Sequence, residues 1–339
     1  MVGAHTTLVR RAEQNTGPNV HYLETLPEAL EPGLAERPET YIWSERPNTK
    51  PEAWPANVAT APNVRTVLDV GHKVQWGWPV AAYLVTKGLA AGVAMLAPFA
   101  EQLGLRGTPL RWAPEVIALV FTLITTFLLV EDLHRPLKFL TLLTRPNTKS
   151  WLVKGAWILM AFSGTVSATL AAQWFGFEQF VQPLRWVNAV LGLGVAGYTA
   201  FLFAQCEGRD LWQSKLLLPH LLVQALVCGS TVLLCFAGRN YEPLRSIACV
   251  SLLLHAVFMA LERHKKHATS NARQAAAFLD VVRWGRVPAF RFGLLAGVLA
   301  TMPMMAVAPG RALVCIPVLF ALFVYKYAYI RAAQLPPLS

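Results

Sequence analysis

Charged side chains are scarce in this sequence: they make up 14% of its 339 residues, whereas 55% are hydrophobic. A soluble domain usually carries about 25% charged residues. Most of the charges fall in residues 1–75 and in a few loops. The stretches between them are apolar over about 20 residues, the length that crosses a bilayer. This distribution excludes an ordinary soluble enzyme and predicts an all-α integral membrane protein.

Cysteine is also scarce, and the five cysteines form no Cys-x-x-Cys pair. All of them lie inside or beside apolar segments, where a cysteine packs as a small hydrophobic residue. Such a set assembles neither an iron–sulfur cluster nor a zinc site, so we expect any metal centre used in electron transfer to belong to a partner protein. The five are Cys206, Cys228, Cys235, Cys249 and Cys315.

Acidic residues are outnumbered by basic ones, 19 to 30, which gives a formal net charge of +11. In a soluble protein this excess would suggest nucleic acid as a partner. Here the basic residues lie in loops between apolar segments, where the positive-inside bias of membrane proteins accounts for them. We therefore expect the loops to face the anionic headgroups of the lipid bilayer, and we predict no nucleic-acid partner.

Eight apolar segments predict eight transmembrane helices, within a membrane domain of residues 76–331. Two of the segments contain a proline, Pro303 or Pro317, which neighbouring helices can accommodate. Residues 1–75 contain eight prolines and no spanning run, which predicts a largely irregular extra-membrane arm that gains order on a partner or stays disordered. Residues 332–339 form a tail. The segments are 76–100, 114–132, 151–174, 183–206, 216–237, 246–261, 292–307 and 312–331.

An even number of spans places both chain ends on one side of the membrane, here called the terminal side. The predicted loops on this side, 133–150, 207–215 and 262–291, contain 13 Lys or Arg residues, and those on the far side contain five. The positive-inside bias therefore places both termini in the cytoplasm.

Ionisable and hydrogen-bonding residues gather in the terminal half of the predicted spans, while the far half contains little beyond Glu115. Polar groups in a span often mark function, although span ends also attract them. A quinone site needs an apolar slot, donors for two ring oxygens and a route for protons, which such a cluster would supply. The gathered residues are His72, Lys73, Glu131, Asp132, His134, Arg135, Tyr198, Glu207, His220 and His255.

Lys87 lies eleven residues into the first predicted span, which is about 16 Å deep at 1.5 Å per residue. Its ammonium group cannot easily reach either surface from that depth, so we expect it to face a polar cavity. One interpretation is a role in proton passage or quinone binding. The other is a structural lysine bonded to backbone carbonyls and waters.

Several segments carry a family resemblance. The first span reads Trp76-Gly-Trp-Pro-Val-Ala-Ala-Tyr-Leu-Val-Thr-Lys-Gly-Leu-Ala-Ala-Gly92, and the fourth contains Gly197-Tyr-Thr-Ala200. The most specific match follows the second span, with Glu131-Asp-Leu-His-Arg-Pro-Leu-Lys-Phe139, Arg145-Pro-Asn-Thr-Lys-Ser-Trp151 and Gly155-Ala-Trp157. Over residues 70–215 the chain resembles the polysulfide reductase membrane subunit family, also called NrfD-like or PsrC-like.

The resemblance implies an eight-helix core of two four-helix bundles that binds exchangeable menaquinone or ubiquinone and contains no haem or iron–sulfur cluster. It implies docking to an iron–sulfur subunit, which serves a molybdopterin-type or related catalytic subunit. The chain would then be a quinone-binding anchor in the bacterial inner membrane, not catalytic alone, with or without proton transfer. In the polysulfide reductases the partner lies on the periplasmic side, whereas the charge bias here predicts a cytoplasmic docking face.

On the same resemblance, Tyr198 matches the family's quinone-contacting tyrosine, and His72 lies where its histidine near the first helix is expected. Trp76, Trp78 and Tyr83 of the first-span segment are further candidate quinone contacts; an interfacial aromatic belt is the alternative for the two tryptophans. The candidates for proton transfer, or for a structural polar site, are Lys87, Glu131, Asp132, His134, Arg135 and Glu207.

Two other functions stay open at this point. His220 and His255 lie on neighbouring predicted spans in the same half of the membrane, an arrangement compatible with a bis-imidazole haem b subunit. A transporter or channel with Lys87 in its cavity is the other alternative, although no paired broken helices or inverted repeats are evident.

A C-terminal alkaline phosphatase fusion tests the orientation, because that enzyme needs disulfides that form only outside the cytoplasm. We expect the full-length fusion to be inactive in cells and a fusion truncated in the far-side loop 238–245 to be active. Phosphatase activity from the full-length fusion would contradict the cytoplasmic placement of the termini.

Overall fold

The computed structural model describes residues 76–105, 110–131, 146–237, 241–299, 301–302 and 314–336. These ranges are almost entirely helical, apart from short turns and one antiparallel hairpin of β1 (Arg283–Trp284) and β2 (Val287–Pro288). The arm predicted for residues 1–75 lies outside the described residues. So do four predicted site residues, His72, Asp132, His134 and Arg135.

Seven helices in the described ranges are long and apolar enough to cross a membrane, and they confirm the multi-pass architecture. Each begins within five residues of the start of a predicted span, because hydrophobic length follows bilayer thickness. They are α3 (Trp78–Leu96, continued by the 3₁₀ turn η7, Ala97–Phe99), α4 (Ala113–Glu131), α6 (Trp151–Trp174), α7 (Glu178–Ala204), α8 (Leu217–Leu234), α9 (Glu242–His264) and α13 (Cys315–Gln334).

The chain between α9 and α13 forms shorter elements. After α10 (Ser270–Phe278) and the hairpin, α11 (Ala289–Leu294) runs into the π-helix η11 (Leu295–Leu299). Together α11 and η11 make an apolar helix too short to span a bilayer alone. The predicted seventh span, 292–307, is described only over 292–299 and 301–302, so an eighth crossing stays a prediction.

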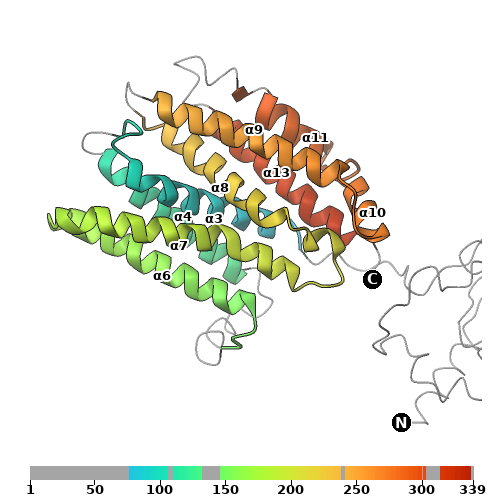
Figure 1. Cartoon of the computed structure of the whole chain (residues 1–339), viewed down its shortest axis with the longest axis horizontal. Helices are drawn as coiled ribbons and strands as arrows, with labels where there is room; N and C mark the ends of the chain where they lie inside the picture. The colour runs from blue at the N-terminus through green and yellow to red at the C-terminus, as the bar shows by residue number, and fades with distance from the viewer. Residues whose placement is uncertain are drawn as a thin grey trace, which may run out of the picture. The chain divides into compact units, whose positions relative to one another are not determined.

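Helix α3 lies between two groups of helices (Figure 1). It packs against α4 and α7 on one side and against α8 and α13 on the other, and it is the most buried of the seven long helices. Helix α6 packs on α7, and α9 packs on α8. The outer helices turn large apolar side chains outward, among them Phe127, Val190 and Ile316, as a lipid-facing surface requires.

Small residues bring α3 and α8 into backbone contact. A Cβ atom on Gly92 would lie 1.8 Å from the carbonyl oxygen of Ala225, and one on Gly229 would lie 2.3 Å from the carbonyl carbon of Gly92. Glycine at these two positions therefore allows the close approach that helices in a bilayer use for packing.

A buried ion pair joins α4 to α7 in the far half, which the sequence had led us to expect nearly bare. Arg185 donates from Nε to Glu115 Oε1 over 2.6 Å and from Nη2 to the Arg111 carbonyl over 2.8 Å. Nearby, the Asn188 amide donates to the Thr169 hydroxyl over 2.8 Å. The expectation of a nearly bare far half was wrong, because Arg185 lies at the start of the predicted span 183–206 and pairs with Glu115 inside the bundle.

Adding a methyl group at Gly92 tests the contact between α3 and α8. We expect Gly92→Ala to destabilise the protein by about 1–3 kcal/mol, because the new Cβ meets backbone that cannot turn aside. Gly164→Ala on α6 is the matched control, since nothing lies within 4 Å of its added Cβ. Detergent thermal-stability scans compare the two, and equal melting temperatures would contradict the packing assignment.

The ion pair in the far half generates a second stability prediction. Arg185→Met leaves the buried Glu115 carboxylate without its cation and should cost about 3–5 kcal/mol. Glu178→Gln, which breaks the exposed Arg111–Glu178 pair of the same region, should cost about 0–1 kcal/mol. The same thermal scans measure both variants, and a similar small loss in each would show that the buried pair is not structural.

Candidate functional site

A buried hydrogen-bond network joins α8, α9 and α13. Every member is at most 4% exposed, although polar groups are costly to bury in a membrane domain. The network residues are His220 and Gln224 on α8, His255 and Glu262 on α9, and Tyr325 and Lys326 on α13.

Helical spacing places these side chains toward one another. His220 and Gln224 are four residues apart and so share a face of α8. His255 and Glu262 are seven residues apart on α9, which separates them by about 10 Å along the same face. Tyr325 reaches this face from α13.

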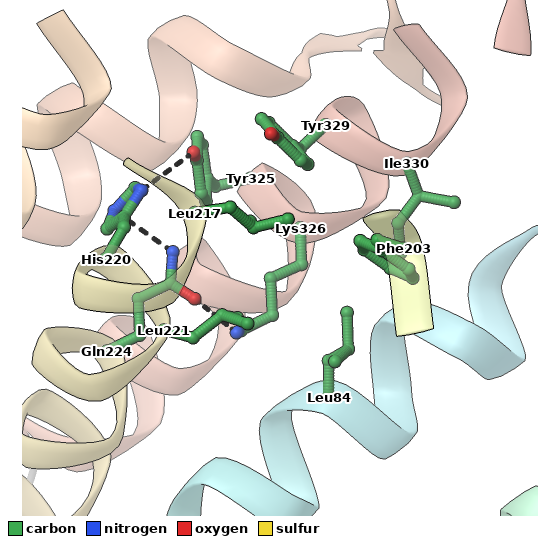
Figure 2. Close-up of a pocket in the computed structure, with 10 residues that line it drawn as sticks. All are labelled: Leu84, Phe203, Leu217, His220, Leu221, Gln224, Tyr325, Lys326, Tyr329 and Ile330. Atoms are coloured by element: carbon green, nitrogen blue, oxygen red, sulfur yellow. Dashed lines mark hydrogen bonds between the residues drawn. The ribbon is translucent and has the colours of Figure 1, made fainter. Parts of the chain in front are cut away.

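The imidazole of His220 is at the centre of the network. Its Nδ1 lies 2.8 Å from Glu262 Oε1, and its Nε2 lies 2.7 Å from His255 Nδ1 and 3.0 Å from Gln224 Nε2. The Tyr325 hydroxyl donates to Glu262 Oε2, and the Lys326 ammonium donates to Gln224 Oε1. Figure 2 shows Gln224 between Lys326 and His220.

The donors and acceptors assign a direction to this series of bonds. An ammonium group only donates, so Lys326 fixes Gln224 Oε1 as its acceptor and turns the amide NH₂ toward His220. His220 Nε2 then accepts, and its Nδ1–H donates to the carboxylate of Glu262. Every bond from Lys326 to Glu262 therefore points the same way, from the ammonium to the carboxylate.

A cavity lies beside the network (Figure 2). Its polar wall includes His220, Gln224 and Lys326, and apolar side chains from α3, α7, α8 and α13 line the rest. Among these, Leu84 lies one turn before Lys87 on α3, and Phe203 lies one turn after Thr199 on α7. The cavity therefore lies between the network and the surroundings of Lys87.

Lys87 and Tyr198, two residues singled out from the sequence, lie together. The Lys87 ammonium is 4.4 Å from the centre of the Tyr198 ring and donates to the Thr199 hydroxyl and the Ala196 carbonyl. Both side chains are at most 2% exposed. The Tyr198 ring packs on Gly155, where an added Cβ would lie 2.3 Å from ring atom Cε2. Bonding to a backbone carbonyl matches the structural interpretation of Lys87, and its role in proton passage stays a prediction.

The two tryptophans at the start of α3 differ in their surroundings. Trp78 is 52% exposed, as a residue of an interfacial belt would be. Trp76 instead stacks on Phe203 and Trp212, with ring centres 5.4 and 4.9 Å away. Its backbone exchanges hydrogen bonds of 3.0 and 2.9 Å with the Gln334 side chain at the end of α13. Trp76 therefore ties the start of α3 to the end of the membrane domain.

The remaining described candidates are spread out. Tyr83 is buried on α3, one turn before Lys87 and on the same face. Glu131 ends α4 and Glu207 follows α7, and both are exposed. The structure thus brings Tyr83, Lys87 and Tyr198 into one region and leaves the two carboxylates at the surface.

Arg209, outside the spans, holds the end of α13. Its Nη1 donates to the carbonyls of Gln334 and Pro336 over 3.2 and 3.1 Å. Burial lowers the pKa of the Arg209 guanidinium, and the neighbouring Cys206 thiol opposes this shift. Burial also raises the pKa of Cys206, which favours its neutral thiol form.

The bis-imidazole alternative does not fit the observed geometry. His220 and His255 bond directly to each other, with ring centres 4.9 Å apart. Two axial ligands of one haem must face the iron from opposite sides, whereas these two nitrogens face each other. The two histidines are members of a hydrogen-bond network in this structure.

Sequence reasoning missed four of the six network residues, Gln224, Glu262, Tyr325 and Lys326. Three signals could have found three of them. Lys326 is a charged residue inside an apolar segment, and Glu262 is the first residue after the predicted span 246–261. Gln224 follows His220 by one helical turn.

Comparison with known proteins agrees with these features. The family model described as polysulphide reductase, NrfD, matches residues 66–336. The protein is 29% identical over 183 residues to the C subunit of polysulfide reductase from Wolinella succinogenes, a match that covers 48% of this chain and 58% of that protein. The matched part is thus less than two thirds of the relative's length. Because the family model extends over most of the sequence and over all seven long helices, this membrane protein belongs to the polysulphide reductase NrfD family.

Proposed function

We propose that the protein is the quinone-binding membrane anchor subunit of a multi-subunit respiratory oxidoreductase. It would exchange electrons between the quinone pool and an iron–sulfur partner subunit, which serves a molybdopterin-type or related catalytic subunit. The observation that carries this proposal is the similarity to a subunit of polysulfide reductase, combined with buried hydrogen-bond donors in the membrane domain.

The residues around Lys87 include the types of side chain that a menaquinone or ubiquinone headgroup needs, namely hydrogen-bond donors and apolar surface. A quinone accepts hydrogen bonds at two ring oxygens, and when bound it would supply two-electron, two-proton redox chemistry. Tyr198 and Lys87 are buried donors of the required type, and Leu84 and Phe203 supply apolar surface one turn away. Tyr83 on α3 and Trp76, which precedes that helix and stacks on Phe203, border the same region. We propose Trp78 as a further contact, and His72, which lies outside the described residues, on the family resemblance alone.

Exchange of protons with solvent belongs to the same proposal. The carboxylates of Glu131 and Glu207 are exposed near the helix ends, where they can take up or release protons. Asp132, His134 and Arg135 follow Glu131 directly in the sequence, and we propose that they serve the same route or hold it in place.

We also propose an eighth crossing, which would complete two four-helix bundles. Gln334 at the end of α13 bonds to Trp76 beside the start of α3, and Lys265 after α9 bonds to Ser214 before α8 over 2.6 Å. Helices α9 and α13 therefore both end on the terminal side, so the chain between them has to return to the far side. The pair α11 and η11 supplies the first part of this crossing: Gly293 and Gly297 face successive turns of α13 in the opposite direction.

The complex would lie in the bacterial inner membrane with its docking face in the cytoplasm. Support comes from basic side chains after α9, where Lys266, Arg273, Arg283 and Arg286 are exposed on the terminal side. A positive surface of this kind is typical of the cytoplasmic face.

Substituting the proposed quinone contacts tests the function in the whole complex. We expect Tyr198→Phe and His72→Ala each to lower quinone-linked turnover about tenfold, because one hydrogen bond to the headgroup is lost. Steady-state kinetics with varied quinone measure the effect, and activity with an artificial acceptor should not change. Tyr241→Phe at the far end of α9 is the control. Unchanged quinone kinetics in both variants would remove these residues from the site.

A further inference from the structure

The network of α8, α9 and α13 extends from the terminal edge of the membrane domain into its interior. Glu262 lies in the last turn of α9, at the terminal edge of the membrane domain. His255 lies seven residues deeper on the same face, about 10 Å into the domain. His220 bonds to both, so three titratable groups connect the terminal edge to the interior.

We propose that this network transfers a proton between the interior and the terminal side, and that the orientation of the Gln224 amide controls the transfer. The proposal rests on the quinone-linked function above, because reduction or oxidation of a quinone takes up or releases the protons to be moved. It assigns proton transfer to residues separate from Tyr198 and Lys87.

Each transfer is balanced within the network. A proton binds His255 at Nε2 while the Nδ1–H of His255 passes to Nε2 of His220, and the Nδ1–H of His220 passes to Oε1 of Glu262. Each imidazole gains one proton and loses one, so both end neutral in the other tautomer. Glu262 becomes a carboxylic acid and releases its proton on the terminal side. The two transfers between side chains cross gaps of 2.7 and 2.8 Å, which are ordinary hydrogen-bond lengths.

Gln224 opposes the completed transfer. Once His220 carries its proton on Nε2, that N–H lies between the unprotonated Nδ1 of His255, 2.7 Å away, and the amide NH₂ of Gln224, 3.0 Å away, so two donors face each other on the Gln224 side. The amide has to turn so that Oε1 accepts from His220. Turning breaks the bond from Lys326 to the same oxygen. Lys326 therefore holds the network in its starting state through Gln224.

The surroundings keep the proton on this route. The Phe258 ring stacks on His220 with centres 5.1 Å apart, and the Phe290 ring lies 6.1 Å from Tyr325. Cys228 on α8 and Lys87 on α3 interact with Lys326, and most of the charged or titratable groups that face His220 in the described ranges belong to the network. They are Glu262 and His255 from α9 and Tyr325 and Lys326 from α13, with Tyr329 one turn further along α13 and bonded to the Leu211 carbonyl.

Infrared spectroscopy of the purified full-length protein tests whether Glu262 takes up the proton. Every carboxylate contributes a C=O band on acidification, and the component from Glu262 should be missing from the acid-minus-neutral difference spectrum of Glu262→Gln. The same component should shift in Tyr325→Phe, which removes the hydroxyl that donates to Glu262. Tyr327→Phe on the same helix is the matched control and should leave the band unchanged, because the Tyr327 ring packs on Trp284 and Arg331 outside the network. A difference spectrum of Glu262→Gln that equals that of the unmodified protein would overturn the proposal. If Glu262→Gln does not fold, an unshifted Glu262 band in Tyr325→Phe would overturn the proposal.

Control of the transfer by the Gln224 amide is tested separately. Lys326→Met and Gln224→Leu should each increase the carboxylic-acid band at pH 7 about threefold or more, the factor that one hydrogen bond controls. The double variant should equal the single ones, because Lys326 acts only through Gln224. Additive effects, or no change in either single variant, would show that the amide does not control the proton.

Proteoliposomes that contain the native complex separate this proposal from the quinone function. Quinone-dependent electron transfer and pH change are recorded together. With Glu262→Gln we expect the number of protons moved per electron pair to fall about tenfold while quinone-dependent electron transfer continues. Normal proton movement in the variant would overturn the proton route alone. Absence of quinone-dependent electron transfer in the unmodified complex would overturn the proposed function.

Discussion

The close contact between α3 and α8 positions Lys87 and the two network residues of α8, His220 and Gln224, in the described part of this membrane domain. Gly92 and Gly229 let the two backbones meet, and α3 is thereby enclosed by helices on all sides. An enclosed helix can carry a lysine in mid-membrane, because Lys87 then reaches a hydroxyl and a carbonyl on α7 in place of lipid. The same contact places α8, with His220 and Gln224, next to the cavity that α3 borders.

The buried charges satisfy their bonding needs in two different ways. Glu115 and Arg185 form a complete ion pair, in which the guanidinium bonds to both carboxylate oxygens and to a backbone carbonyl. Both oxygens of Glu115 accept hydrogen bonds from a guanidinium that stays charged, so the pair serves to join α4 to α7. The network around His220 places neutral groups between its carboxylate and its ammonium, and histidine can exchange protons on either nitrogen.

Hydropathy predicted the positions of the long helices, since bilayer thickness sets a length that apolar runs reveal. Helix α6 matches the predicted segment 151–174 at both ends. Hydropathy does not report how each helix is rotated about its axis, and rotation decides which side chains meet. His220 and His255 were therefore placed in the same half of the membrane, but their bond to each other and the partnership with Glu262 needed the structure. Family resemblance selected Tyr198, and depth selected Lys87; their contact, 4.4 Å from ammonium to ring, was predicted by neither.

The cavity between Lys87 and the network indicates how the proposed quinone site and the proposed proton route could work together without sharing residues. Apolar side chains line part of the space that separates them, and its polar wall includes the Gln224 amide, to which Lys326 donates. A change of charge near Lys87 would act on the Lys326 ammonium across a medium that screens weakly, since a low dielectric strengthens Coulomb interactions. Displacement of Lys326 by such a change would release Gln224 and so permit proton transfer through His220. Electrostatic coupling of this kind needs no helix movement, which agrees with the tight backbone contact between α3 and α8.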